Sequence, residues 1–255
     1  MGTGLLQTIS DNLQFVAVCA VVIAAIIGAS YGLEATVLKK NIAQVGKTRY
    51  ITICGMLGAI AMILHILDFP LVAIAPSFYK LDFSEIPVMI GAFCLGPVGG
   101  VVIELVKILL KLIIKGTSTA FVGDLANFVV GCSFVVPAAV IYHLKKTRAM
   151  AIIGLTVGTV VLVVFGTMFN AIYLLPAFAT LYGMPLDSII SMGTAVNGAV
   201  TNVTTFVIFC VGPLNLIKGI CISVPTMLLY KRISVVLRTA SSDSYAAGKN
   251  RQPQG

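Results

Sequence analysis

The sequence contains very little charge. Only 10% of its 255 residues are Asp, Glu, Lys or Arg, whereas 58% are hydrophobic and the mean hydropathy is +1.04. A water-soluble domain of this size could not cover its surface with so few charged side chains. The composition therefore predicts an integral membrane protein with about six or seven spans of roughly 20 residues. Unbroken apolar runs such as 152–165 favour helices over the alternating strands of a barrel.

The residue types that build metal sites and catalytic centres are also scarce. The two histidines, His65 and His143, lie far apart, and the six cysteines all stand in apolar segments without a CxxC pair. Such cysteines are typical of small apolar side chains. The chain has no HExxH, GxSxG or G-x-x-x-x-G-K-[ST] motif. These absences predict that the protein is not an enzyme, holds no metal or cofactor, and binds no ATP through a P-loop.

Acidic residues inside the apolar segments are rare as well. Glu104 is the only one well inside a predicted span. Ion-coupled transport uses chains of acidic side chains within the membrane, so their scarcity disfavours proton coupling. If the protein moves a solute uphill, we expect the energy to come from a partner.

The basic residues are present in excess and are grouped. The net charge is +8, but grouping between apolar segments is the positive-inside signature of cytoplasmic loops, not a nucleic-acid surface. The groups are Lys39, Lys40, Lys47 and Arg49; Lys145, Lys146 and Arg148; Lys231, Arg232 and Arg238; and Lys249 and Arg251.

The apolar segments alternate with these groups and predict the topology. The expected spans are 13–37, 51–67, 84–97, 100–115, 124–144, 150–175 and 212–230. Segment 69–83 contains prolines and is expected to be a structured outer loop that folds over something apolar. Segment 177–211 is ambiguous and is able to add a further span. With the N-terminus outside, this count places the basic groups inside. The polar tail 239–255 is expected to be disordered.

Two sets of polar residues within the spans are candidates for binding a polar ligand. Asn215 and Lys218 are three positions apart and therefore share a helix face. Alternatively, Lys218 reaches the outer interface and Asn215 packs between helices. Asn170 lies in an apolar span and needs a partner, either a ligand or a neighbouring helix.

Three other patterns have a structural explanation beside a functional one. Glu104 and Lys107 are spaced to form an ion pair that lowers the cost of both charges in lipid, and Lys111 is expected to reach the outer interface. Ser84 is placed to cap the following span, with Glu85 in its first turn. The small residues Gly55, Gly58 and Ala59 permit close approach of another helix. Phe78, Tyr79, Leu81 and Phe83 are placed to present an apolar or aromatic surface to a ligand.

Several motifs, taken in order, resemble one family. Together they are similar to the riboflavin-binding S components of energy-coupling factor (ECF) transporters, over roughly 51–232. The motifs are KLDFSEIP at 80–87, GPVGG at 96–100, ELVK at 104–107, GDLAN at 123–127 and NLIKG at 215–219.

The resemblance implies an all-α integral membrane protein of the bacterial cell membrane. The expected fold is the six-helix S-component bundle over 51–232, plus one extra N-terminal transmembrane helix within 1–50 and a disordered cytoplasmic tail, 233–255. The family implies a loop that closes over riboflavin at the outer face. It also implies docking on a membrane coupling protein that carries two cytoplasmic ATPases. Riboflavin is then the transported ligand and not a cofactor.

The resemblance also implies roles for particular residues. Asn170, Asn215 and Lys218 match the polar ligand contacts, and the apolar chemistry of a flavin fits the surrounding side chains. Alternatives are an S component for another vitamin, a partner-independent secondary transporter and a membrane enzyme. The full predicted set is Asn170, Asn215, Lys218, Leu81, Phe78, Phe83, Ser84, Asp124 and Asn127 for substrate, and Gly55, Gly58 and Ala59 for docking.

Overall fold

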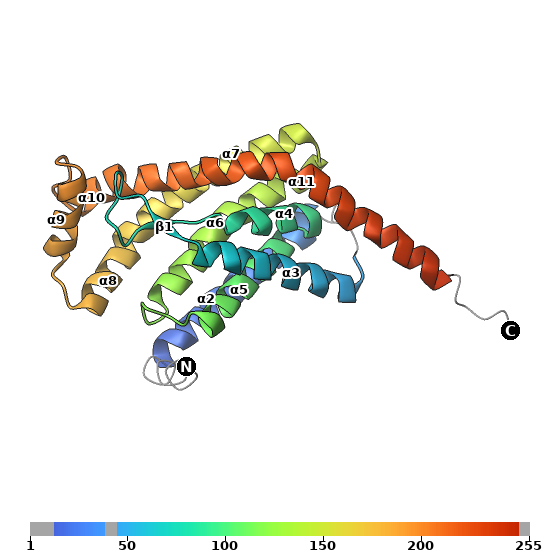
Figure 1. Cartoon of the computed structure of the whole chain (residues 1–255), viewed down its shortest axis with the longest axis horizontal. Helices are drawn as coiled ribbons and strands as arrows, with labels where there is room; N and C mark the ends of the chain where they lie inside the picture. Colours follow the sequence, from blue (N-terminus) through green and yellow to red (C-terminus); the bar gives the residue numbers. More distant parts are fainter. Residues whose placement is uncertain (1–12, 39–44, 250–255) are drawn as a thin grey trace.

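A computed structural model describes residues 13–38 and 45–249, with side chains up to residue 232 (Figure 1). The chain is a bundle of helices with one short hairpin. In chain order its elements are α2 (Leu13–Leu33), the π-helix η1 (Glu34–Leu38), α3 (Lys47–Ile66), β1 (Phe69–Pro70), β2 (Lys80–Leu81), α4 (Glu85–Leu95), α5 (Pro97–Ile114), α6 (Val122–Lys145), α7 (Arg148–Phe169), η2 (Asn170–Leu174), α8 (Leu175–Tyr182), α9 (Leu186–Val196), α10 (Val203–Phe206), η3 (Val207–Val211) and α11 (Gly212–Lys249).

Aromatic and aliphatic side chains from α3, α4, α6, α7 and α11 fill the centre of the bundle. The rings of Phe93 and Tyr142 stack with centroids 4.4 Å apart, and Tyr230 of α11 meets both edge-on. The six cysteines are free thiols, in agreement with their interpretation as small apolar side chains. This core fixes α4 and α11 against each other, which matters because both contribute to the polar site described below.

Glycines let α6 and α7 approach closely. A Cβ atom at Gly154 would lie 2.6 Å from the carbonyl oxygen of Ala138, and one at Gly158 would lie 2.7 Å from that of Phe134. Small residues of this kind are the usual means of close helix packing in membranes. Lipid tails are as apolar as the helix surfaces, so burial of apolar area alone does not drive the helices together. The two helices therefore form a tightly joined pair.

Five stretches among the described residues are long and apolar enough to cross a membrane. They are Leu13–Leu38, Lys47–Ile66, Val122–Lys145, Arg148–Tyr182 and Val203–Arg232. The expected spans 84–97 and 100–115 correspond to α4 and α5. Helix α4 has 11 residues, about 16 Å, which is shorter than the roughly 30 Å hydrocarbon core. Helix α5 carries three charged residues, so the predicted count of seven spanning helices is not confirmed.

The ambiguous segment 177–211 does not add a span. It contains the end of α8, the 11-residue α9, the single turn α10 and η3. In Figure 1 these elements lie at the same end of the bundle as the β1–β2 hairpin. We call this the loop end. The opposite end, from which α11 projects, we call the basic end.

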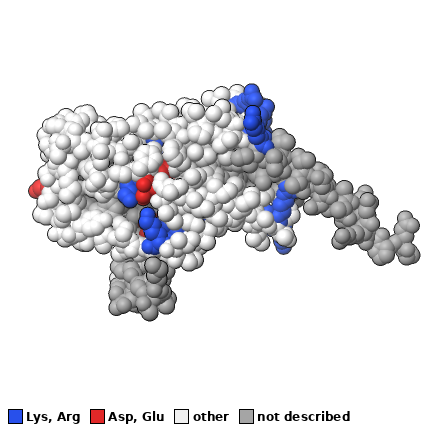
Figure 2. Space-filling view, in the orientation of Figure 1, with Lys and Arg blue, Asp and Glu red and all other residues white. Residues whose placement is uncertain are grey.

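Several helices begin or end at the basic end. Helix α3 begins at Lys47, α6 ends at Lys145, α7 begins at Arg148, and Lys231 and Arg232 lie on α11. Figure 2 shows Lys and Arg gathered toward this end, and a mixed acidic and basic group nearer the loop end. The arrangement fits a cytoplasmic basic end.

The C-terminal boundary differs from the expected one, whereas the first span agrees with it. Helix α11 continues to Lys249, whereas the sequence predicts a disordered tail from 233 onward; residues 250–255 lie outside the described residues. The predicted first span is present as α2 and η1. Residues 1–12 and 39–44, including the basic pair Lys39 and Lys40, also lie outside the described residues.

Candidate functional site

The segment between α3 and α4 is a structured loop, as the sequence predicts, and it also folds back on itself, which the sequence does not predict. Phe69 pairs with Leu81 and Pro70 with Lys80 in an antiparallel hairpin. The Lys80 ammonium lies 3.1 Å from both carboxylate oxygens of Asp68, across the base of the hairpin. We call residues 68–84 the hairpin loop. Its apolar middle packs on α8, α9, α10 and η3, so the loop covers the end of the bundle.

Asn170 lies beneath the hairpin loop, and both the oxygen and the nitrogen of its side-chain amide form hydrogen bonds. The Tyr79 hydroxyl donates to Asn170 Oδ1 at 2.7 Å, and Asn170 Nδ2 donates to the carbonyl oxygen of Gly166 at 2.7 Å. Asn170 begins the π-turn η2, a helix irregularity that is frequent at functional sites. The amide therefore has the partners that a buried polar group requires, and one of them belongs to the loop.

Asn215 approaches the same glycine from the other side. A Cβ atom at Gly166 would lie 2.7 Å from Asn215 Nδ2, so a larger residue there would force the Asn215 amide to shift. Asn215 is 8% exposed, and no described residue accepts a hydrogen bond from its Nδ2. A buried donor without an acceptor costs about 1–3 kcal/mol. The η2 turn and the α11 helix thus bring two amides to Gly166 of α7, and only the Asn170 amide has hydrogen-bond partners for both its oxygen and its nitrogen.

Lys218 lies one turn further along α11 and is ion-paired. Its ammonium is 3.0 Å from Glu85 Oε1 and 3.6 Å from Asp82 Oδ2, and its side chain is 13% exposed. Asp82 also contacts His65 Nδ1 at 3.3 Å and accepts from the Ser84 backbone N–H at 2.8 Å. Lys218 therefore does not extend to the interface. It joins α11 to α4 and to the end of the hairpin loop.

The Asp82 carboxyl is strongly held in its charged form. Burial alone would raise its pKa, but the charge of Lys218 and the contact with His65 outweigh burial and hold that pKa well below its usual range. Asp82 is thus a fixed negative charge at the base of the loop.

A second polar cluster surrounds Lys107. Its ammonium pairs with Glu104, confirming the predicted ion pair, and lies 3.6 Å from Glu85 Oε1. It also donates to Ser84 Oγ at 3.1 Å and to Asn127 Oδ1 at 2.9 Å. Glu104 and Lys107 are fully buried. Because Glu85 contacts both Lys107 and Lys218, the two clusters form one network, which we call the charge network.

This network bears on three expectations. Besides Glu104 within its helix, three further acids at helix starts or in the loop are buried, since Asp82, Glu85 and Asp124 are each at most 5% exposed. Ser84 precedes α4 but makes no side-chain capping bond, so the predicted cap is wrong. Lys111 pairs with Asp124, and its side chain is 14% exposed. Each of these buried acids has a lysine beside it, as the cost of burying charge requires.

The remaining predicted ligand residues divide into two groups. The ring of Phe78 lies beside that of Tyr79, tilted by 39° with centroids 4.7 Å apart, whereas the ring of Phe83 lies near that of Phe69 at the base of the hairpin. Leu81 is buried. Asp124 and Asn127 bond lysines of α5, as described above. The structure therefore brings Phe78 close to the loop–Asn170 contact, and joins Ser84, Asp124 and Asn127 to lysines of α5.

The predicted docking residues do not share one face. A Cβ atom at Gly55 would meet no atom within 4 Å, and Gly55 is exposed. A Cβ atom at Gly58 would lie 2.5 Å from Val106 of α5, because Gly58 is buried between helices. Ala59 is half-buried. Gly55 and Ala59 are accessible to a partner, whereas Gly58 serves packing within the chain.

Gly166 and His65 are site residues that the sequence analysis did not select, and it did not predict the bond of Tyr79 to Asn170. Their roles depend on contacts across long sequence separations, such as Tyr79 with Asn170, and no local pattern signals them. The described residues hold no group of three or more His, Cys, Asp or Glu side chains placed for a metal ion. The expectation of no metal or cofactor stays a prediction.

The fold and the site define a multi-pass helical membrane protein with a loop folded over buried polar groups at one end. The sequence model of the family described as "ECF transporter, substrate-specific component" matches residues 49–230. The chain therefore belongs to this family of membrane transport components and is not an enzyme. The match begins after α2 and η1, so these elements lie outside the matched region.

Individual relatives agree with the family. The chain is 36% identical to "Riboflavin transporter RibU" of Staphylococcus aureus over 190 residues, covering 74% of this chain and 92% of the relative. It is 29% identical to "Riboflavin transporter FmnP" of Bacillus subtilis, covering 73% and 93%. A solved structure described as "Structure and mechanism of the S component of a bacterial ECF transporter" is 33% identical with a TM-score of 0.58, covering 75% of this chain and 99% of the other.

Proposed function

We propose that this chain is the riboflavin-binding S component of an ATP-driven ECF importer, which captures riboflavin at the outer face. The relatives above are named riboflavin transporters. The observation that carries the proposal is the meeting of Asn170 and Asn215 at Gly166, beneath the hairpin loop. Riboflavin has an apolar tricycle with a polar imide edge, and a site for it needs a few placed amides within apolar walls.

The open donor of Asn215 supports a ligand contact. Ligand binding would give this buried N–H the acceptor that the described chain does not provide. Lys218 adds a positive donor one turn away, already oriented by Glu85 and Asp82. Phe78 and Tyr79 provide aromatic surface on the loop side. Riboflavin is the cargo in this proposal, and the protein needs no cofactor of its own.

The direct test is to purify the full chain in detergent, record its absorption spectrum and titrate riboflavin while measuring flavin fluorescence. A yellow protein, or stoichiometric quenching of the fluorescence, is the expected result. A colourless protein that leaves riboflavin fluorescence unchanged but responds to another vitamin would assign a different ligand to the same fold.

Gly166 provides a sharper test of the amide pair. In Gly166→Ala the new methyl group would displace Asn215, and we expect riboflavin affinity to fall about tenfold, in line with loss of one hydrogen bond. Alanine favours helix over glycine by about 1 kcal/mol, so the thermal stability should not fall in parallel. Gly28→Ala on α2, where a Cβ atom meets nothing within 4 Å, is the control. Unchanged affinity in Gly166→Ala would remove Asn215 from the proposed site.

We further propose that delivery requires docking on a membrane coupling protein with two cytoplasmic ATPases. This rests on family membership and on the accessible small residues Gly55 and Ala59 of α3. The buried acids are each paired with a lysine, which leaves no chain of free acids for ion coupling within the described residues. Riboflavin uptake by this chain in cells that lack all such ATPases would instead establish a partner-independent transporter.

The two glycines of α3 separate docking from folding. Gly55→Leu adds a side chain on an open face, so we expect riboflavin binding to be retained and uptake to fall by at least about tenfold through loss of close helix contact. Gly58→Leu drives a side chain into Val106, so folded yield and binding should fall together. Uptake assays in whole cells, beside riboflavin titration of purified protein, measure both. Normal uptake by folded Gly55→Leu would place docking elsewhere.

A further inference from the structure

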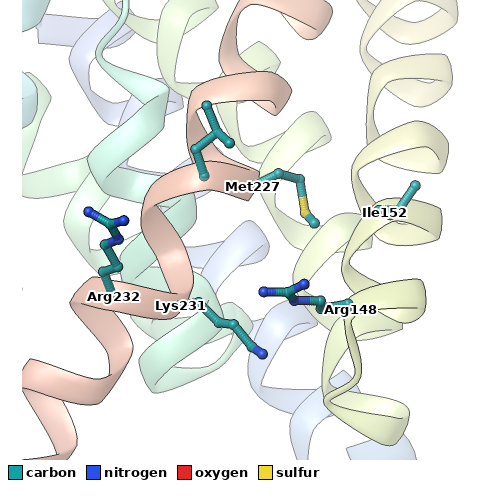
Figure 3. Close-up of a pocket in the computed structure, with 6 residues that line it drawn as sticks. Arg148, Ile152, Met227, Lys231 and Arg232 are labelled. Atoms are coloured by element: carbon teal, nitrogen blue, oxygen red, sulfur yellow. The ribbon is translucent and has the colours of Figure 1, made fainter.

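The basic end contains a groove between α7 and α11, separate from the loop end. Its volume is about 880 Å³, and its lining residues are Arg148, Ile152, Met227, Leu228, Lys231 and Arg232 (Figure 3). In Figure 3 Arg148 extends from α7 toward α11, Lys231 extends toward Arg148 across the gap, and Arg232 lies on the other side of α11. The described residues that line the groove thus include three cations and no acid.

The groove has an apolar part that continues into the lipid-facing surface. Ile152 is 54% exposed and Leu228 is 71% exposed. One to two turns deeper, Val160 of α7 and Val224 of α11 are also exposed. An occupant of the groove therefore meets cations at the membrane boundary and hydrocarbon-compatible side chains below them.

We propose that this groove binds an anionic phospholipid of the inner leaflet, with the phosphate between Arg148 and Lys231 and an acyl chain along Ile152 and Leu228. A guanidinium matches phosphate oxygens in a two-bond geometry. Clustered Lys and Arg beside the cytoplasmic end of a spanning helix attract anionic lipids. A soluble anion would use the cations but not the apolar wall, and a zwitterionic lipid would bring a second, positively charged group next to its phosphate, which these three basic side chains repel.

The chain lacks tryptophan, which allows a single reporter to be introduced. Leu228→Trp places the reporter on the groove wall. The full chain carrying it is reconstituted into nanodiscs that contain either brominated phosphatidylglycerol or brominated phosphatidylcholine, and fluorescence quenching gives the relative affinity of the two lipids. We expect preference for phosphatidylglycerol, with a contribution of roughly fivefold for each cation that contacts the head group.

Two comparisons make the result specific. Adding Arg148→Gln or Lys231→Gln to Leu228→Trp should lower the preference by that factor. Adding Lys115→Gln should leave the preference unchanged, because Lys115 is an exposed lysine directly after the C-terminal end of α5 and does not line the groove. A second reporter, Ile172→Trp, is 73% exposed in a stretch without basic residues and should be quenched equally by both lipids.

Several outcomes would overturn the proposal. Equal quenching of Leu228→Trp by the two lipids would exclude a specific site. The same preference at Ile172→Trp, or a preference unaffected by Arg148→Gln and Lys231→Gln, would show general attraction to the membrane surface. Equal quenching together with loss of riboflavin uptake in the charge variants would assign the groove to a protein partner.

Discussion

Replacing Lys218 with alanine is expected to weaken riboflavin binding by about two orders of magnitude, the loss expected for a charged hydrogen bond to a ligand in a buried site. The chain should still fold, although with lower thermal stability, because Glu85 still lies beside Lys107 and Asp82 still lies beside His65. Binding is measured by fluorescence titration of the purified variant, and folding by its elution profile and thermal unfolding in detergent.

Asn215→Ala is the companion variant. It removes the open amide and breaks no hydrogen bond that its Nδ2 makes within the described chain, so we expect weaker binding by about tenfold or more without lower stability. Lys80→Ala is the control, since Lys80 pairs with Asp68 at the exposed base of the hairpin. If both Lys218→Ala and Asn215→Ala bind riboflavin with unchanged affinity, the proposed site is wrong.

Replacing Lys107 with methionine should have the largest effect on folding. Lys107 is fully buried and faces Glu104 and Glu85, so its loss leaves two buried carboxylates short of a positive partner. Breaking a buried ion pair in this way costs about 3–5 kcal/mol, which is a large fraction of the stability of most proteins. We expect little folded Lys107→Met in detergent, as judged by yield and by the midpoint of thermal unfolding.

The double variant Lys107→Met with Glu104→Gln tests the electrostatic explanation. It removes one charge of each sign and should recover part of the lost yield, because an uncompensated buried charge is the main cost. Lys115→Met, at an exposed position, should behave as the unmodified chain. A stable single variant would show that the carboxylates do not depend on Lys107, and no recovery in the double variant would indicate a packing defect instead.

Local spacing predicted part of the site correctly. Glu104 and Lys107 are three residues apart on one helix, and they pair as expected. Asn215 and Lys218 likewise share a face of α11. The spacing does not show, however, that Asn215 lies against Gly166 or that Lys218 pairs with Glu85. A structured loop over an apolar surface was predicted from prolines within an apolar segment, and it is present, whereas its short hairpin was not predicted. Whether these residues contact riboflavin stays a prediction.

Contacts between distant parts of the chain were not predictable. Lys218 and Glu85 are 133 residues apart, and Tyr79 and Asn170 are 91 apart. Spacing gave Glu85 a role at the start of α4 and gave Gly58 the same role as Gly55. The structure confirms Glu85 in the first turn of α4 but also places it between two lysines, and it packs Gly58 against Val106. Such assignments depend on which helices become neighbours.

The sequence by itself determined that this is a multi-pass membrane protein, which segments lie near its boundaries and which end is basic. These properties follow from the hydrophobicity and charge of contiguous residues, because each segment enters the membrane or stays in water according to its own composition. Only the tertiary structure decided that the two asparagines meet at Gly166 and that Lys218 is held by Glu85. Those contacts arise because each buried polar group must find a partner among the helices packed around it.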